Sequence, residues 1–369
     1  MRPFSLSKAM NEHILTHSQN RIGTLTLNRP QALNSLSLDM VRAITRALLD
    51  WRDDAAIDAV LVCSNSEKAF CAGGDIRFFY QAGQQTTRQG SALLDDFFTE
   101  EYVLNRLIHH YPKPYLVFMD GIVMGGGMGI AQCNASGRLR IVTERSKLAM
   151  PEVNIGLFPD VGGSYFLSRC PGQLGTWLAL SANAIGAADA LHTGLADVFI
   201  PAAQLPALKN LLSSGHHSDI AAQVRNFAAQ FGDAGESELA GQRDRIDHHF
   251  SHDDVPSIMA SLAADAAPFA QATLAAMQKR SPLMLCVTLQ QLRRGADLTL
   301  EDCLRMERAM MRQCFLHGEA LEGIRAAVID KDMQPAWSPA RLEDVSAEMV
   351  AEFFQPAWPP HAHPLRCWL

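Results

Sequence analysis

Two glycine-rich segments constrain the fold of this chain more than any other feature of its sequence. Residues 71–76 contain the pair Gly73-Gly74, and residues 124–127 contain three consecutive glycines. Each segment follows a stretch that we interpret as a strand. Glycine has no Cβ atom, so the main chain can approach another group closely at these positions. The two segments are therefore expected to hold one bound group between backbone N–H donors.

Apolar patterns around these segments predict alternating strands and helices. Residues 21–27 alternate as in a half-buried strand, and residues 59–63 are continuously apolar, as in a strand buried on both faces. Between them, the apolar side chains of residues 38–51 fall on one face of a helix. Further strands are predicted over residues 115–119, 121–124, 139–143 and 198–201, with a helix opening at residue 125. This alternation favours an α/β core in which crossovers join the strands.

The predicted strands stop near residue 201, and the chain becomes rich in alanine and in helical patterns. Helices are predicted over residues 257–277, 283–294, 301–316 and 322–328. Many prolines near the C-terminus predict an irregular tail. We therefore divide the chain into a core over residues 1–205, a helical C-terminal region over 206–340 and a tail over 341–369.

Composition and charge exclude several classes of partner. The 369 residues are 48% apolar and carry a net charge of −7, so no basic surface is expected to attract nucleic acid or anionic lipid. No run approaches membrane-spanning length, and residues 1–20 make a poor presequence. The eight cysteines are scattered without a CxxC motif, which favours reduced thiols. The expected location is the cytoplasm.

Gly74 and Gly126 are the candidates for an oxyanion hole, in which two backbone N–H groups stabilise developing negative charge. Either residue alone could be an ordinary turn glycine. Their pairing, each after a predicted strand, favours the oxyanion hole. Phosphate binding is disfavoured, because the sequence lacks GxxxxGK[ST] and residues 125–129 lack GxGxxG spacing.

Two carboxylates follow the second glycine-rich segment. Glu152 comes after Pro151 at the end of a predicted strand and is a candidate catalytic base, the alternative being a solvated or helix-starting acid. Asp160 is a candidate second acid, the alternative being the N-cap of a helix over residues 161–166. With the glycine pair, these carboxylates favour chemistry on an acyl thioester.

Six stretches together resemble the crotonase (enoyl-CoA hydratase/isomerase) superfamily, and within it the branch of 3-hydroxyisobutyryl-CoA hydrolases. They are residues 28–34, 68–77, 100–102, 113–129, 143–166 and 322–332. The resemblance covers most of the chain. It implies an α/β fold with the crotonase spiral of ββα repeats and a helical C-terminal region, and a homo-oligomer built as a trimer or a multiple of trimers.

The resemblance also assigns roles to individual residues. Gly74 and Gly126 match the oxyanion-hole glycines, Glu152 matches the active-site glutamate, and Asp160 matches the second carboxylate of the hydrolase branch. Glu101 matches an acid that contacts the substrate there. Substrate binding is thus assigned to Glu101, Gly126, Glu152 and Asp160.

The CoA part of the substrate is expected to bind largely to backbone. The resemblance places it near Ala32, Leu33, Lys68 and Ala72, with Arg29 or Lys68 beside the phosphates. Both cations could equally be ordinary solvated charges. No separate cofactor is implied, since CoA belongs to the substrate.

Two departures from the superfamily pattern bear on the reaction. Hydratases carry a glutamate where this chain has Gly129, and they usually have a glycine where it has Asp160. Addition of water across a C=C bond uses a pair of carboxylates. This chain lacks that pair, because the position of the second hydratase glutamate is Gly129, so hydration is disfavoured. Residues 131–137 are longer than the hydrolase pattern, which leaves the register of the second glycine loop open.

The leading hypothesis is an acyl-CoA thioesterase that hydrolyses 3-hydroxyisobutyryl-CoA in valine breakdown. The alternatives are an enoyl-CoA hydratase or isomerase, and a non-catalytic protein that binds acyl-CoA or another protein. No metal is expected, and the histidines within residues 247–254 are interpreted as part of a surface linker. Cys71 is interpreted as a structural thiol, because no histidine or aspartate has a motif-linked position to activate it.

Overall fold

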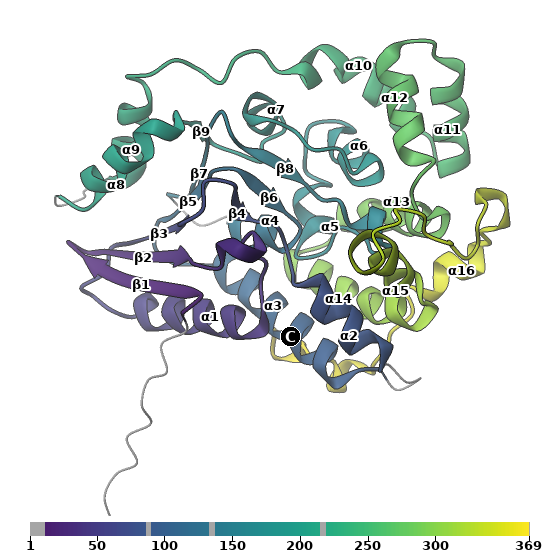
Figure 1. The fold of residues 1–369 in the computed structure, drawn as a ribbon, viewed down its shortest axis with the longest axis horizontal. Coiled ribbons are helices and arrows are strands. Elements are labelled where there is room, and N and C mark those ends of the chain that lie inside the picture. The colour runs from purple at the N-terminus through teal and green to yellow at the C-terminus, as the bar shows by residue number, and fades with distance from the viewer. Residues whose placement is uncertain (1–11, 86–89, 133–136, 215–218, 369) are drawn as a thin grey trace, which may run out of the picture.

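A computed structural model describes residues 12–85, 90–132, 137–214 and 219–368 (Figure 1). Its centre is a six-stranded sheet in the order β1-β2-β3-β5-β7-β9, in which β1 and β2 are antiparallel and all later neighbours are parallel. The strands are β1 (Ile14–Gln19), β2 (Ile22–Leu27), β3 (Ala59–Ser64), β5 (Tyr115–Met119), β7 (Leu139–Val142) and β9 (Val198–Phe199). The predicted α/β core is confirmed, and β1 is a strand that the sequence analysis missed.

The sheet is buried on both faces, as the apolar strands predict. In β3, Val60 and Val62 belong to the main hydrophobic core, whereas Leu61 and Cys63 belong to a second cluster on the other face. The helices α8 (Leu205–Leu212) and α9 (Ile220–Ala228) cover that second cluster. Figure 1 shows both helices beside the strands, far from the remaining C-terminal helices. A two-residue period therefore divides each central strand between two cores.

A second, three-stranded parallel sheet carries the glycine-rich segments. It has the order β4-β6-β8, with β4 (Ala69–Cys71), β6 (Ile122–Met124) and β8 (Lys147–Ala149). The short helix α4 (Gly126–Ala131) begins two residues after β6, and Gly74 follows β4 and forms an isolated parallel bridge with Leu36. Since neighbouring parallel strands end at one edge of a sheet, both segments lie at the same edge.

Three N-terminal helices pack beside this edge: α1 (Leu38–Arg52), α2 (Ile76–Gln84) and α3 (Ala92–His109). Helix α1 begins at an N-cap, Ser37, which accepts a hydrogen bond from the Met40 N–H, and its apolar face is buried. Helix α3 packs against α1 and brings Glu101, Tyr102 and Asn105 into the interior.

The remaining helices follow the predicted pattern with local differences. They are α5 (Gly163–Phe166), α6 (Leu174–Ser181), α7 (Ala187–His192), α10 (Glu238–Phe250), α11 (Val255–Ala264), α12 (Pro268–Met277), α13 (Pro282–Gly295), α14 (Leu300–His317), α15 (Glu319–Ile324) and α16 (Ala347–Glu352). No helix among the described residues is long and apolar enough to cross a membrane.

Helices α13 and α14 pack on α5, and α14 also packs on α3. One hydrophobic cluster runs from Ile14 to Leu365, so it takes in residues from all three predicted parts of the chain. The division at residues 205 and 340 stays a prediction. The packing does show that the C-terminal helices α13 and α14 enclose the interior on the side of α3 and α5.

Three local predictions were wrong. The helix expected over residues 257–277 is two helices, because Asp265 accepts a hydrogen bond from the Ala267 N–H and Pro268 starts α12. The histidine-rich stretch is the end of α10 rather than a surface linker, and His249 is buried against Ser261 and Asp265. The tail contains the helix α16. The length of residues 131–137 left the register of the second glycine loop open. Most of these residues lie outside the described part of the chain.

Candidate active site

The two predicted oxyanion-hole glycines meet at the edge of the small sheet. Gly126 is the first residue of α4, and a Cβ atom built on it would lie 3.4 Å from the Gly74 backbone nitrogen. The same Cβ would lie 2.6 Å from Glu101 Oε1. The first N–H groups of a helix have no partner within that helix. A glycine at position 126 thus lets two backbone N–H groups and a carboxylate share one small space.

Glu152 lies beside the start of α4. It is the first residue of a 3-10 helix, Glu152–Ile155, and its side chain is buried. Its Oε1 would be 2.8 Å from a Cβ built on Gly125, and its Oε2 is buried without a hydrogen-bond partner among the described residues. Glu152 therefore starts a helical turn, which was one of the alternatives considered for it. Its side chain faces the glycine loop rather than solvent, so it is not a solvated acid.

Asp160 is buried next to the same space, and it is not the N-cap of the following helix. The N-cap of α5 is Gly162, whereas Asp160 Oδ2 accepts a hydrogen bond of 2.7 Å from the Tyr102 hydroxyl. The next residue, Val161, has a φ of +51°, which is a strained conformation for a β-branched side chain. Strain of this kind often accompanies functional loops.

Glu101 completes the group. It precedes Tyr102 on α3, is almost fully buried, and its Oε1 has no partner among the described residues. The structure therefore brings Glu101, Glu152 and Asp160 together near the glycine pair, and the roles assigned to them stay predictions.

Burial and mutual repulsion govern the ionisation of these acids. Burial, and then repulsion from Asp160, raise the pKa values of Glu101 and Glu152 well above the ordinary value. Burial raises the pKa of Asp160 to about 7, against the opposing effect of the Tyr102 hydrogen bond. The ionisation of Glu101 and of Glu152 therefore depends on the charge of Asp160. A dry site of this kind also strengthens any hydrogen bond to a developing oxyanion.

The C-terminal helices fix the loop that carries Asp160. Glu307 on α14 accepts hydrogen bonds from the N–H groups of Gly162, at 2.8 Å, and Ser164, at 2.9 Å. Gln291 on α13 donates hydrogen bonds to the Pro159 carbonyl, at 2.6 Å, and to the Ser164 hydroxyl, at 2.8 Å. These two side chains hold both ends of the turn around Asp160.

The sequence analysis missed both residues. Glu307 carried a usable signal, because it stands on the apolar face of α14 with Leu304 and Met311, where an acid has no solvent to face. The sequence gave no such signal for Gln291, because uncharged polar side chains are common on long helices.

The residues predicted for CoA lie on two loops that meet. The Ala72 N–H donates a hydrogen bond of 3.0 Å to the Leu33 carbonyl, and Ala32 ends the 3-10 helix Pro30–Ala32. Lys68 is exposed nearby in sequence. Arg29 is not an ordinary solvated charge, since it pairs with Asp75 at 2.9 Å. The assignment to CoA stays a prediction.

Cys71 and the histidines that the structure describes are not arranged for a thiol nucleophile or a metal site. Burial raises the pKa of Cys71 to about 12, which is opposite to what a thiolate nucleophile needs. Among the residues that the structure describes, no group of three or more histidine, cysteine or acidic side chains is arranged to hold a metal ion. The seven cysteines within this part are free, and Cys133 lies outside it.

Comparison with known proteins places this arrangement in one family. The family model described as enoyl-CoA hydratase/isomerase matches residues 22–354. The chain belongs to the enoyl-CoA hydratase/isomerase family. The crotonase fold with its helical C-terminal region, which the resemblance implied, is thereby confirmed.

Individual members of this family are similar over most of their length. A protein of Gallus gallus described as "3-hydroxyisobutyryl-CoA hydrolase, mitochondrial" is 39% identical over 336 residues, which are 90% of this chain and 86% of that protein. One of Danio rerio with the same description is 40% identical over 341 residues, 91% of this chain and 87% of the relative. A crystal structure described as a carnitinyl-CoA dehydratase from Mycobacterium thermoresistibile has a TM-score of 0.87 and 38% identity, and the match covers 95% of this chain and 98% of that one.

The hydrogen bonds of Glu307 lead to a first prediction. In Glu307→Gln, an amide NH₂ group faces one of the two backbone N–H donors, so the free energy of unfolding should fall by about 1–3 kcal/mol. Burial raises the Glu307 pKa to about 8, from roughly 4.3 in an unfolded chain. Wild-type stability should therefore decline as pH rises from about 4 to about 8, and the variant should decline less steeply.

Urea unfolding at a series of pH values measures both effects. The matched control is Glu343→Gln, because Glu343 is exposed on the surface. Equal stability and equal pH dependence of Glu307→Gln and the wild type would contradict this role.

A second prediction concerns Asp160. In Asp160→Asn the negative neighbour of Glu152 is removed, so the pKa of Glu152 should fall. The rising limb of kcat/KM against pH should then move to lower pH by roughly one unit, even where the maximum rate is reduced. The measurement is a pH–rate profile beside Asp344→Asn, which changes an exposed acid. A limb that stays in place in Asp160→Asn would show that the two carboxyls are not coupled.

Proposed function

We propose that this protein is a thioester hydrolase that converts 3-hydroxyisobutyryl-CoA and water into 3-hydroxyisobutyrate and CoA. The observation that carries the proposal is the pair of backbone donors at Gly74 and Gly126, set against the buried carboxyls of Glu152 and Asp160. The substrate class is supported by the relatives described as 3-hydroxyisobutyryl-CoA hydrolases, whose match covers about nine-tenths of this chain.

In the proposed reaction, the thioester carbonyl oxygen lies between the N–H groups of Gly74 and Gly126. These donors stabilise the oxyanion that forms when the carbonyl carbon is attacked. Glu152 acts in one of two ways: it attacks the carbonyl itself, giving a mixed anhydride that water then opens, or it takes a proton from the attacking water. In both cases the C–S bond breaks and the thiolate of CoA takes up a proton.

Asp160 and Glu101 are proposed to act on the acyl group. Asp160 lies close enough to Glu152 to raise its pKa, and it would orient the β-hydroxyl of the substrate or assist the proton transfers. Glu101 Oε1, which faces the position of a Gly126 side chain, would contact the substrate there. Partly protonated acids suit this task, because each can donate as well as accept.

Hydration or dehydration of an acyl-CoA is the second candidate. It is favoured by the presence of two carboxyls near one site and by the description of the 38% identical structure as a carnitinyl-CoA dehydratase. Against it stands Gly129, because the hydratase pattern has a glutamate at this position. A non-catalytic acyl-CoA-binding protein is the third candidate.

Several accompanying predictions stay open. They are CoA binding at Ala32, Leu33, Lys68 and Ala72, a homo-oligomer built as a trimer or a multiple of trimers, the absence of a cofactor, a role in valine breakdown and a cytoplasmic location. Free cysteines throughout the described chain support a reducing compartment. The Gallus gallus and Danio rerio relatives are described as mitochondrial.

The deciding experiment is free-thiol release from 3-hydroxyisobutyryl-, 3-hydroxypropionyl-, crotonyl- and acetyl-CoA. The wild type should release thiol rapidly from the two β-hydroxy esters. Glu152→Gln keeps the size of the side chain but removes the base, so its kcat should fall at least about a hundredfold. The control is Glu343→Gln, which should match the wild type.

The other outcomes separate the alternatives. Loss of crotonyl-CoA absorbance without thiol release would favour the hydratase. Ester binding in calorimetry without turnover of any ester would favour the binding protein. Near-normal thiol release by Glu152→Gln would contradict the proposed mechanism.

A further inference from the structure

The three buried acids near the glycine pair differ in how their carboxyl groups are held. Glu101 Oε1 and Glu152 Oε2 have no hydrogen-bond partner among the described residues. Asp160 Oδ2, in contrast, accepts a hydrogen bond of 2.7 Å from the Tyr102 hydroxyl. A hydrogen bond to one oxygen fixes the orientation of a carboxyl group. Asp160 is therefore suited to bind one atom of a substrate at a defined place.

Tyr102 is itself held in the interior. It lies in the middle of α3, its side chain is fully buried, and its ring packs on that of Phe98, with 6.2 Å between the ring centroids. Burial, and then repulsion from Asp160, raise the pKa of Tyr102 well above the ordinary value. The phenol therefore keeps its proton at neutral pH and remains a hydrogen-bond donor.

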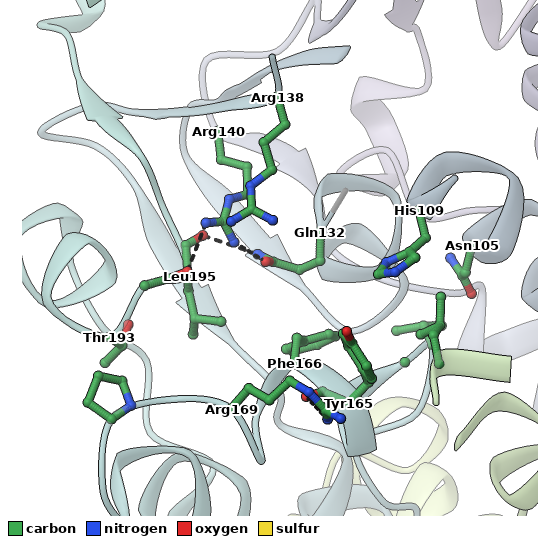
Figure 2. Close-up of a pocket in the computed structure, with 16 residues that line it drawn as sticks. Asn105, His109, Gln132, Arg138, Arg140, Tyr165, Phe166, Arg169, Thr193 and Leu195 are labelled. Carbon is green, nitrogen blue, oxygen red and sulfur yellow. Dashed lines mark hydrogen bonds between the residues drawn. The ribbon is translucent and has the colours of Figure 1, made fainter. Parts of the chain in front are cut away.

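Packing alone does not fix the loop that carries Asp160. The next two residues, Val161 and Gly162, line a cavity of about 390 Å³, which His109 also lines (Figure 2). Residues beside a cavity lose packing contacts on that side. The orientation of Asp160 therefore depends on hydrogen bonds. Helices α13 and α14 supply those that hold the backbone of its turn, and Tyr102 supplies the one that holds its carboxyl group.

The hydrogen bond from Tyr102 leaves Asp160 with acceptor capacity. A carboxylate offers about four lone pairs, and the phenol uses one of them on Oδ2. Donation from the phenol favours the charged form of Asp160, whose pKa burial raises to about 7. A hydroxyl group placed beside this carboxylate meets an acceptor that is already oriented. An acyl group without a hydroxyl leaves that buried acceptor unpaired, which costs free energy.

The location of Asp160 fits an acceptor for the β-hydroxyl group of an acyl-CoA. In 3-hydroxyisobutyryl-CoA the hydroxyl oxygen is three bonds from the thioester carbon, so its acceptor must lie close to the group that acts on that carbon. Glu152 has this role in the proposed reaction. Asp160 lies near enough to Glu152 for its charge to raise the Glu152 pKa.

We propose that Tyr102 is the positioning residue through which Asp160 selects acyl-CoA esters that carry a β-hydroxyl group. The Tyr102 hydroxyl holds Oδ2, and a remaining lone pair of the carboxylate accepts a hydrogen bond from the substrate hydroxyl. The inference rests on the proposed hydrolase function and deepens it, because it assigns the choice of acyl group to one hydrogen bond. The substrate hydroxyl is not consumed in the reaction, so it serves recognition.

The test compares 3-hydroxyisobutyryl-CoA with isobutyryl-CoA, which has the same carbon skeleton without the hydroxyl, in the thiol-release assay. The wild type should prefer the hydroxy ester in kcat/KM by at least about a hundredfold. In Tyr102→Phe this preference should fall about tenfold, because Asp160 loses the hydrogen bond that orients it. The loss should come from the hydroxy ester, and kcat/KM for isobutyryl-CoA should change less than about threefold.

The matched control is Tyr111→Phe. Tyr111 is also buried, and its hydroxyl donates a hydrogen bond of 2.8 Å to the Leu48 carbonyl. The control therefore removes the same atom and a hydrogen bond of similar length. Its position is about two and a half helical turns beyond Tyr102, so the preference between the two esters should stay at the wild-type value.

A second comparison asks whether Tyr102 acts through Asp160. In Asp160→Ala the acceptor is absent, so adding Tyr102→Phe should not change the preference any further. An added effect in that background, an unchanged preference in Tyr102→Phe, or an equal loss of rate for both esters would overturn the inference. So would a wild type that hydrolyses both esters equally well. A wild type that releases thiol from neither ester would contradict the proposed function instead.

A measurement on the wild type covers the case in which Tyr102→Phe does not fold. The fluorine of 3-fluoroisobutyryl-CoA is close in size to a hydroxyl group but has no proton to donate. The wild-type kcat/KM for this ester should therefore lie within about tenfold of that for isobutyryl-CoA. A value equal to that for 3-hydroxyisobutyryl-CoA would overturn the acceptor role of Asp160, and with it the role of Tyr102.

Discussion

The rest of the site depends on the close approach of two glycine-rich loops. A Cβ on Gly126 would lie 3.4 Å from the Gly74 nitrogen and 2.6 Å from Glu101 Oε1, so no other residue fits without moving the oxyanion donors or the acid. The small parallel sheet creates this contact, because β4 and β6 end at one edge. In the proposed reaction, glycine removes the side chain at the point where the thioester carbonyl would approach both N–H groups.

A second constraint acts on the acids around those donors. Glu101, Glu152, Asp160 and Glu307 are all buried, and burial raises their pKa values, with repulsion from Asp160 adding to the effect at the three glutamates. Such a cluster is costly for the fold, and it persists because Tyr102 and backbone N–H groups satisfy part of it. The C-terminal helices supply Glu307, so the region beyond the α/β core takes part in placing Asp160. The burial of these four side chains therefore bears both on the stability of the fold and on the proposed chemistry.

The sequence predicted those parts of the structure that depend on local pattern. Strand β5 lies where the apolar run placed it, and the two glycine loops lie next to each other and to Glu152. The sequence pattern gave wrong predictions where contacts between side chains and other parts of the chain determine the structure. His249 is buried because α11 covers it, and the predicted helix over residues 257–277 breaks at Asp265. Gln291 could not be recognised from sequence, because its role depends on contacts with Pro159 and Ser164, which lie far from it in the chain.

The central claim is that the N–H groups of Gly74 and Gly126 hold the thioester carbonyl. Infrared spectroscopy of 3-hydroxyisobutyryl-CoA, labelled with ¹³C at the thioester carbonyl and bound to Glu152→Gln, tests it most directly. Two hydrogen bonds in a dry site polarise the C=O bond, so its stretching frequency should be lower than that of the ester free in water. A bound ester whose carbonyl frequency equals or exceeds that of the free ester would contradict the account.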